Sequence, residues 1–315
     1  MTPGEMSRRQ FVGRIVAGAA GFRVAGLQPR GGEPRFDPKG LPTRVLGRTG
    51  VRVPLIGLGC GSRFCRIKDP DESVRLLNEA LDSGFYYWDT AHDYTWGGVV
   101  SEERLGLVLK TRRKEVFLAS KVGPRDVEKA KRHLEESLRR LRTDYLDLYQ
   151  IHLVRSRKDV DEIGKSGGLV EWLHRLKEEG VTRFIGFTGH LSAEAMLAAL
   201  ERFALDTVLV ALDHYRGGKE PFEEKLVPAA VERGLGVSVM KIIRPREKVR
   251  DIPAEKLIRY ALSIPGVAAA VIGIDSVEIL RKNVQLLKRF KPLTGEEFRS
   301  LRMSMLPFFD SEADA

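Results

Sequence analysis

Short apolar runs alternate with amphipathic stretches along most of this chain, and this alternation constrains its fold more than any other feature. The apolar runs are rich in β-branched and aromatic residues, which is typical of buried strands. They lie at residues 55–58, 85–88, 116–120, 146–151, 184–187, 207–212, 237–240 and 268–272. Eight strands alternating with helices over about 250 residues predict an α/β protein, a single-domain (β/α)8 TIM barrel.

The stretches between the apolar runs predict helices with recognisable ends. Two of them stop at Gly180 and Gly234, where glycine commonly follows a helix. The predicted helices cover residues 71–82, 127–141, 169–179, 192–203, 222–233, 254–263, 277–289 and 296–305. An open, doubly wound sheet is the alternative, and it usually carries a G-x-G-x-x-G turn after an early strand. Residues 57–61 are glycine-rich but lack the third glycine, so the barrel is favoured.

The N-terminal segment, residues 1–35, is predicted to lie outside the barrel domain, which is assigned to residues 36–315. Ser-Arg-Arg-Gln-Phe at 7–11, followed by a Gly/Ala-rich stretch, resembles a twin-arginine export signal. Arg23 interrupts that stretch before about 20 apolar residues, so no integral membrane segment is predicted. A basic tail is the alternative. Export to the periplasm or cell exterior and a cytoplasmic location therefore both stay open, and the fold is expected to begin near Leu41.

Composition excludes several classes of protein. Hydrophobic residues make up 43% and charged residues 30% of the chain, which is ordinary for a globular protein. The net charge of +10 invites a nucleic-acid partner. No motif interleaves aromatic with basic residues, so no nucleic-acid partner is predicted. Two cysteines, Cys60 and Cys65, cannot complete a four-ligand zinc site. They are interpreted as thiols rather than as a disulfide, and no metal is predicted.

Three consecutive predicted strands end in charged or polar residues. Asp89, Lys121 and His152 each follow an apolar run, and Tyr94 lies in the loop after the first of these strands. In a barrel the carboxyl ends of the strands meet at one mouth, where catalytic groups lie. An ammonium near a tyrosine hydroxyl favours the phenolate, so the four residues are a candidate proton-transfer group. Taken singly, each fits a structural ion pair or a rim histidine, but together they favour catalysis.

The sequence around these residues resembles the signature of the aldo-keto reductase family. It reads Asp-Thr-Ala-His-Asp-Tyr at 89–94 and continues with a Ser-Glu and a Leu-Gly pair. Ser-Lys-Val at 120–122 is similar to the family's lysine strand, and residues 144–152 are similar to its histidine strand. Residues 271–283 resemble the family's cofactor-phosphate segment. The resemblance extends over residues 43–287, most of the chain.

The resemblance implies an NAD(P)H-dependent oxidoreductase that reduces aldehyde or ketone carbonyls to alcohols by hydride transfer. By position, Tyr94 would be the general acid and Lys121 would lower the pKa of its hydroxyl. Asp89 would pair with Lys121, and His152 would orient the carbonyl. Tyr94 and His152 would meet the developing alkoxide, an electrostatic contribution that is often large in enzymes.

Several of the family's nicotinamide contacts are altered in this chain. After the fifth strand, where the family often has Ser and Asn for the carboxamide, the sequence has Thr188 and Gly189. On the seventh strand Met240 stands in place of the stacking aromatic, and a thioether can cover a flat ring. Lys241 follows it and is a candidate for the pyrophosphate. All four are assigned to cofactor binding by this resemblance.

The segment after the eighth strand would hold the rest of the cofactor. Its predicted cofactor residues are Gly273, Ser276 and Asn283. Gly273 and Ile279 stand where the family has basic residues for a 2′-phosphate, and Asp275 would repel a phosphate. Arg281 and Lys282 are expected on the helix exterior. NADP(H) is still favoured over NAD(H), mainly because the family generally uses it.

Trp96 and His190 are the candidate substrate-binding residues, and His190 can also supply the donor that Gly189 lacks. The short C-terminal tail predicts an open pocket for a small-molecule carbonyl, a small aldehyde or a sugar-like one.

A cofactor-sensing or regulatory protein with little turnover is one alternative to a carbonyl reductase. An isomerase or lyase that uses Asp89 and Lys121 without a nicotinamide is another. The sequence carries no signal of oligomeric state.

Overall fold

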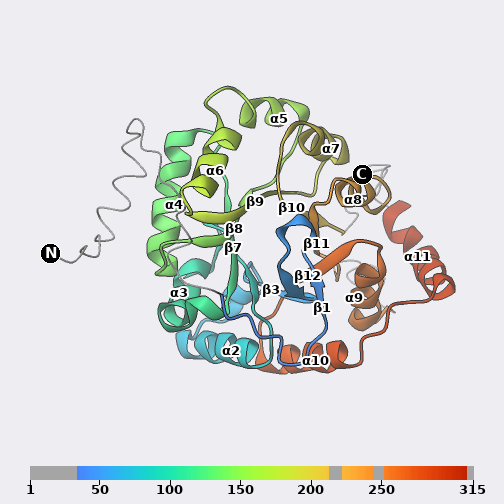
Figure 1. Cartoon of the computed structure of the whole chain (residues 1–315). Helices are drawn as coiled ribbons and strands as arrows, with labels where there is room; N and C mark the ends of the chain where they lie inside the picture. Colours follow the sequence, from blue (N-terminus) through green and yellow to red (C-terminus); the bar gives the residue numbers. More distant parts are fainter. Residues whose placement is uncertain (1–33, 213–221, 244–251, 311–315) are drawn as a thin grey trace.

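The fold is built around a closed barrel of eight parallel strands, in the spatial order β10-β11-β12-β3-β4-β7-β8-β9 (Figure 1). The structure is a computed structural model that describes residues 34–212, 222–243 and 252–310, with side chains up to residue 305. The barrel strands are β3 (Ile56–Gly59), β4 (Tyr87–Asp89), β7 (Phe117–Val122), β8 (Leu146–Ile151), β9 (Thr182–Gly189), β10 (Thr207–Ala211), β11 (Gly236–Met240) and β12 (Val267–Gly273). Each of the eight predicted strands is confirmed near its expected place, and so is the (β/α)8 barrel.

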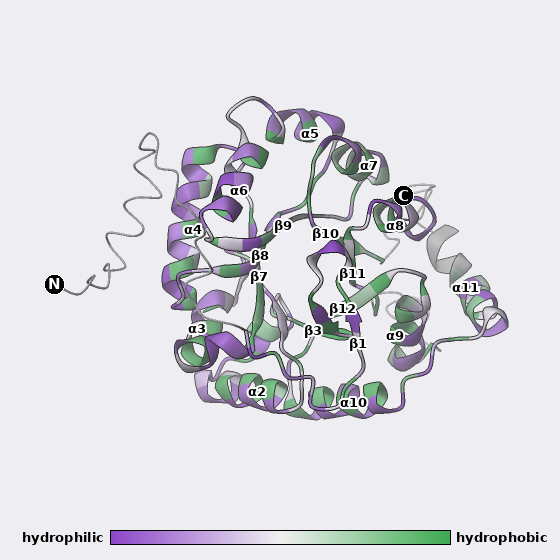
Figure 2. Ribbon diagram, in the orientation of Figure 1, coloured by the Kyte–Doolittle hydropathy of each residue, from purple (hydrophilic) through white to green (hydrophobic). Residues whose placement is uncertain are grey.

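Helices surround the barrel and carry both hydrophilic and hydrophobic residues (Figure 2). They are α2 (Pro70–Asp82), α3 (Ser101–Arg112), α4 (Val127–Leu141), α5 (Arg157–Ile163), α6 (Leu169–Glu178), α7 (Ala193–Arg202), α8 (Phe222–Glu232), α9 (Ala254–Ser263), α10 (Val277–Lys288) and α11 (Gly295–Asp310). Short 3-10 turns occur at η1 (Gly47–Thr49), η2 (Phe64–Arg66) and η3 (Arg113–Glu115). The sequence analysis missed α3 and α5, and it ended α11 five residues early.

Helix α3 escaped prediction because it lacks a continuous apolar stripe and has Gly106 at its centre. A Cβ at Gly106 would overlap the backbone carbonyl of Arg140 in α4. The glycine therefore allows α3 and α4 to pack closely. This close approach matters for the site, because both helices lie behind the loop that follows β4.

Side-chain caps and glycines fix the helix ends where the sequence indicated them. The Asp126 carboxylate accepts from the backbone N–H of Lys129 at 2.8 Å and begins α4. Gly180 and Gly234, which follow α6 and α8, have φ of 72° and 73°. Glycine adopts this left-handed conformation without strain, so the predicted helix ends are confirmed at both places.

A hairpin of β1 (Thr43–Val45) and β2 (Arg52–Pro54) covers the N-terminal end of the barrel. The Arg44 guanidinium donates to the carbonyl of Val267, where β12 begins, at 2.6 Å. Leu46, between the hairpin strands, is fully buried. Before the hairpin, Phe36 stacks on Tyr86 with ring centroids 5.2 Å apart. The sequence analysis did not predict this hairpin, whose strands are three residues each.

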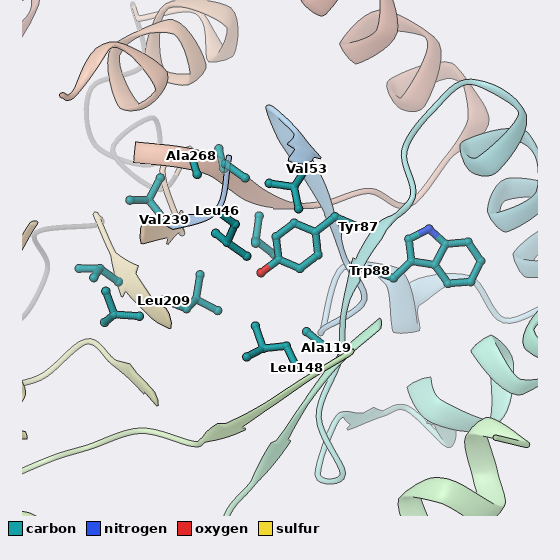
Figure 3. Packing of buried hydrophobic residues seen from close by; sticks show 14 of the residues in the cluster. Leu46, Val53, Tyr87, Trp88, Ala119, Leu148, Leu209, Val239 and Ala268 are labelled. Carbon is teal, nitrogen blue, oxygen red and sulfur yellow. The ribbon is translucent and has the colours of Figure 1, made fainter. Parts of the chain in front are cut away.

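Side chains alternate along the strands, and this places an apolar layer below a polar one inside the barrel. Tyr87 points into the barrel, and Trp88 points the opposite way (Figure 3). Asp89 therefore shares the inner face with Tyr87. In β7 the same alternation puts Ala119 and Lys121 on one face. The polar layer thus lies at the carboxyl ends of the strands, as the sequence predicted.

A small hairpin follows β4 and completes the described fold. β5 (Thr95–Trp96) and β6 (Val99–Val100) form a small antiparallel hairpin after the β4 loop. Within the three described ranges, the helices are all too short or too polar to span a bilayer. The twin-arginine-like segment falls in residues 1–33, outside the described residues, and export stays a prediction.

Candidate active site

A cleft of about 1450 Å³ opens at the carboxyl ends of the barrel strands. Its lining comes from the loops after β3, β4, β8, β9, β11 and β12 and from α10. The predicted site residues that line it are Asp89, Tyr94, Trp96, His152, His190, Met240, Lys241, Gly273 and Asn283. Lys121, Thr188, Gly189 and Ser276 are not among the lining residues. The structure thus brings most of the predicted site together.

Lys121 lies behind Tyr94 and is held by three acceptors. Its Nζ donates to Asp89 Oδ1 at 2.5 Å, to the Thr90 carbonyl at 2.8 Å and to Tyr94 Oη at 3.2 Å. All three ammonium protons are therefore used. The Lys121 and Asp89 side chains are 0% and 4% exposed, so this is a buried ion pair that ends on the tyrosine hydroxyl.

Burial and neighbouring charges act in opposite directions on the pKa of Lys121 and on the pKa of Tyr94. Burial favours neutral Lys121, but the Asp89 carboxylate and the Tyr94 phenol outweigh it and raise the pKa of Lys121 above 10.5. Burial raises the pKa of Tyr94 above its ordinary value of 10.0, and the Lys121 charge offsets only part of that rise. The predicted effect of Lys121, to lower the pKa of Tyr94, is therefore present, but burial outweighs it. Tyr94 stays protonated at neutral pH, as a proton donor must.

Asp89 is fixed by a partner that the sequence analysis missed. The Gln150 amide in β8 donates to Asp89 Oδ2 at 3.1 Å, and Gln150 is buried. On the other side, the backbone N–H of Cys60 donates to the Asp89 carbonyl at 2.8 Å. Gln150 lies two residues before His152, so the strand period places both on the inner face. That spacing was the available signal for Gln150.

His152 lies on the other side of Tyr94, with its ring edge toward the phenol at a centroid distance of 5.8 Å. Its Nδ1 is 3.4 Å from Asp93 Oδ1. Burial raises the pKa of Asp93, but the contact with His152 outweighs burial, and the net pKa is lowered. Asp93 was also missed, although it stands beside Tyr94 within the recognised motif. A carboxylate in this position holds the imidazole in one orientation.

Three predicted cofactor residues have structural duties outside the cleft. The buried Thr188 hydroxyl accepts from the backbone N–H of Leu153 at 2.9 Å. A Cβ at Gly189 would overlap the sulfur of Met196, so this position packs against α7. Ser276 caps α10 by accepting from the backbone N–H of Ile279 at 3.2 Å. The hydroxyls of Thr188 and Ser276 thus each accept one backbone hydrogen bond, and neither residue is in the cleft lining.

The remaining predicted cofactor residues and His190 lie at the cleft as expected. Met240 presents a thioether from the end of β11. Lys241 follows with φ of 60°, a left-handed conformation that costs a non-glycine residue about 1 kcal/mol or more. Its Nζ lies 3.0 Å from His190 Nδ1. Asn283 is buried under the cleft wall in α10, and Trp96 is 58% exposed at the mouth.

Cations lie along the rim near α10, and one of their contacts corrects a sequence expectation. Asp275 forms an ion pair with Arg63 at 3.2 Å, so its charge is balanced rather than free to repel a phosphate. Arg281 and Lys282 are exposed on α10, as expected, and both also line the cleft. Each also pairs with a glutamate on the surface.

The two cysteines are buried free thiols, as interpreted from the sequence. Burial raises the pKa of both thiols, so neither is activated as a thiolate. Across residues 34–212, 222–243 and 252–305, histidine, cysteine and carboxylate side chains form no group suited to a metal ion.

The chemistry of the cleft suits a nicotinamide dinucleotide. Met240, Val271 and Ile272 give it apolar surface for a flat ring. The rim cations, among them Arg63, suit phosphate groups. The residues present therefore fit the cofactor that the resemblance implies.

The fold and the site define a barrel protein in which a tyrosine, a buried lysine–aspartate pair and a histidine meet at the open mouth. Comparison with known families gives a more specific answer. Residues 56–244 match the aldo/keto reductase family, and the chain belongs to this family of oxidoreductases.

Known relatives cover nearly the whole fold. The L-galactose dehydrogenase of Arabidopsis thaliana is 34% identical over 295 residues, 80% of this chain and 90% of that protein. The structure of the aldo-keto reductase AKR11C1 from Bacillus halodurans, in its holo form, has a TM-score of 0.68 at 26% identity and covers 84% of this chain and 96% of that one. An aldo-keto reductase from Klebsiella pneumoniae in complex with NADP and acetate has a TM-score of 0.66 at 29% identity, with 84% and 95% covered.

Proposed function

We propose that this protein is an NAD(P)H-dependent carbonyl reductase in which Tyr94 is the general acid. The observation that carries the proposal is the position of Lys121 Nζ, 2.5 Å from Asp89 Oδ1 and 3.2 Å from Tyr94 Oη. A buried ammonium aimed at a protonated phenol stabilises the negative charge that this phenol acquires when it gives up its proton. The open side of the same phenol faces the cleft.

Each of the site residues has one role in this proposal. A reduced nicotinamide, when bound, supplies the hydride. Tyr94 donates its proton to the carbonyl oxygen as that oxygen becomes negative, and Lys121 stabilises the resulting phenolate. His152 donates a hydrogen bond to the same oxygen and thereby orients the carbonyl. Asp89 and Gln150 keep Lys121 in place.

We propose NADP(H) as the preferred cofactor. Arg63, Arg281 and Lys282 line the cleft and can share their charge between their carboxylate partners and an additional phosphate, and pairing with Arg63 neutralises the nearby Asp275. The Klebsiella relative binds NADP. For the substrate, we propose a small aldehyde or a sugar-like carbonyl, because the mouth is open and carries the polar side chains of His190 and Lys241 beside the exposed ring of Trp96.

A cofactor-sensing protein with little turnover is the second candidate. It is favoured by the nicotinamide side of the site, where the Thr188 hydroxyl is already bound to Leu153 and Gly189 has no side chain. Fewer contacts to the carboxamide would leave the ring less precisely oriented.

The test starts with a fluorescence titration of the full chain with NADPH and with NADH. Trp96, exposed at the mouth, is the expected reporter. Saturable binding that is tighter for NADPH, followed by aldehyde-dependent oxidation of NADPH, supports the proposed function. Tight binding without turnover of any aldehyde in a panel supports the sensor. Binding of neither nucleotide contradicts both.

The variant Tyr94→Phe tests the assigned acid directly. We expect kcat to fall about 10³-fold, within the range for loss of a general acid, while the Kd for NADPH changes less than about threefold. Steady-state reduction of one aldehyde and the same fluorescence titration measure the two quantities. Equal losses of turnover and nucleotide affinity would mean that Tyr94 serves binding rather than proton transfer.

A further inference from the structure

A cluster of polar side chains lies behind the catalytic loop, outside the cleft lining. It consists of His92, Glu102, His133, Glu136 and Arg140, which we call the His92 cluster. His92 Nε2 donates to Glu136 Oε2 at 2.9 Å, and its ring stacks on His133 at a centroid distance of 3.7 Å. Arg140 donates to Glu136 Oε1 at 2.7 Å and to the His92 carbonyl at 3.1 Å. His92 is therefore held through its ring edge, its ring face and its backbone.

The His92 cluster retains polar atoms that an ordinary packed interface would not keep. His92 Nδ1 and Arg140 Nε are buried with no hydrogen-bond partner among the described residues, and Glu102 Oε2 has only an ion-pair contact with Arg140 at 3.9 Å. The Glu102 side chain is 0% exposed, and burial raises its pKa. Buried polar groups without partners destabilise a protein and call for a reason other than stability. Apolar side chains would fill the space between α3 and α4 at lower cost.

The His92 cluster is attached to the loop that carries Asp93 and Tyr94, and this attachment supplies the reason. His92 is followed directly by Asp93, which contacts His152, and then by Tyr94, whose hydroxyl meets Lys121. Asp89 and Lys121 fix the start of this loop from inside the barrel. The loop from 90 to 94 is thus held inside by Lys121 and outside by α4, through Glu136 and Arg140.

We propose that His92 is a positioning residue for the reaction. Its hydrogen bond to Glu136 fixes the loop from 90 to 94, and the loop in turn sets the positions of the Tyr94 hydroxyl and of Asp93 against His152. This inference rests on the proposed function. A displacement of a few tenths of an ångström is enough to matter, since proton donors act only at hydrogen-bond distance from the reacting oxygen.

Two substitutions separate the hydrogen bond from the ring stacking. His92→Phe keeps an aromatic ring against His133 but removes the donor to Glu136. His92→Gln removes the ring and retains an amide donor that can reach Glu136. We expect kcat for aldehyde reduction to fall about tenfold in His92→Phe and less than about threefold in His92→Gln, with the Kd for NADPH within about twofold of wild type in both.

Glu136→Gln provides a second measurement should His92→Phe not fold, because Glu136 lies at the surface of α4 with 39% of its side chain exposed. We expect a fall in kcat of about threefold, since a neutral amide accepts more weakly than a carboxylate. The matched control is Glu128→Gln on the same helix, where Glu128 pairs with Lys131 at 2.7 Å and is 64% exposed. Its kcat should equal that of wild type.

The outcomes distinguish the two proposals. Absent turnover or NADPH binding in wild type overturns the proposed function. Normal turnover in wild type with unchanged kcat in His92→Phe and Glu136→Gln overturns the role of His92. Equal losses in His92→Phe and His92→Gln also overturn it, because they would assign the effect to ring packing. The expected pattern is a lower kcat, unchanged nucleotide affinity and recovery by glutamine.

Discussion

Tyr94 stands between two pairs of a carboxylate and a base that are built in opposite ways. On one side, Lys121 and Asp89 are 0% and 4% exposed, and a further donor, Gln150, holds the carboxylate. On the other side, His152 and Asp93 are 17% and 59% exposed, and their atoms lie 3.4 Å apart. The contact between Lys121 and Asp89 is short and buried, whereas the contact between His152 and Asp93 is longer and partly solvated.

The difference follows from the tasks proposed for each pair. A buried charge is strongly stabilised by its partner and strongly destabilising without it, so the inner pair offers a fixed field with no freedom to adjust. A partly solvated pair contributes little to stability and can shift with the substrate. The end of β4 and the loop that follows it supply the two carboxylates, four residues apart, and this short segment therefore couples a fixed element to an adaptable one.

Breaking the inner pair should have the largest effect. Lys121→Met leaves Asp89 buried without its cation, so we expect the free energy of unfolding to fall by about 3–5 kcal/mol and kcat by about a hundredfold or more. Urea unfolding and steady-state reduction measure the two effects. The matched control is Lys131→Met on α4, which removes a pair whose carboxylate, Glu128, is 64% exposed, and it should change stability by less than about 1 kcal/mol. Similar losses in both variants would mean that burial does not distinguish the pairs.

Breaking the outer pair should affect activity more than stability. In Asp93→Asn we expect kcat/KM for an aldehyde to fall about three- to tenfold, because His152 loses the carboxylate that orients it. The unfolding free energy should change by less than about 1 kcal/mol, since the Asp93 side chain is largely exposed. A stability loss as large as that of Lys121→Met would show that the outer pair is structural.

The pH dependence of reduction should show the smallest change. Burial raises the pKa of Tyr94 above 10.0, so the proton donor is in its active form throughout the neutral range. We expect the rate of the reduction step to vary less than about twofold between about pH 6 and about pH 9 and to fall only at higher pH. Single-turnover rates at saturating NADPH measure this. A fall centred near neutral pH that disappears in Asp93→Asn would assign the titration to the outer pair instead.

The same raised pKa has a consequence for stability, and its sign can be checked. A group that binds its proton more tightly in the folded state stabilises the fold below its unfolded pKa, which is about 10 for tyrosine. That contribution is lost as the pH rises through the higher folded value. Tyr94 therefore favours unfolding only in strongly alkaline solution.

Much of the fold could be predicted because its signals are local. Each barrel strand is a short apolar run, and runs of this kind are visible without knowledge of their neighbours. Helix α3 was missed because its place is set by contact with α4 at Gly106 rather than by an apolar stripe of its own. The hairpin of β1 and β2 was missed because its strands are short and only their packing against the barrel reveals them.

The residues of the candidate site likewise fall into those that local sequence signals identify and those that only the tertiary structure reveals. Asp89, Lys121 and His152 could be found because each ends an apolar run, and Tyr94 because it belongs to a recognised motif. Gln150 lies inside a strand, and nothing local shows that its amide turns toward Asp89. The bond that the Thr188 hydroxyl accepts from the backbone N–H of Leu153 is likewise invisible in the sequence, and the cofactor contact of Thr188 stays a prediction. Such hydrogen-bond partners are decided by the tertiary structure.

The hairpin beneath the barrel also decides how this molecule can be attached to something else. Phe36 packs on Tyr86, and Arg35 donates to Lys114, both beside the starts of barrel strands. The described chain thus enters the fold at the end of the barrel opposite the cleft. A surface, carrier or fusion partner joined ahead of residue 34 would approach the closed end. Immobilised in that way, the protein would keep its open mouth toward the solution.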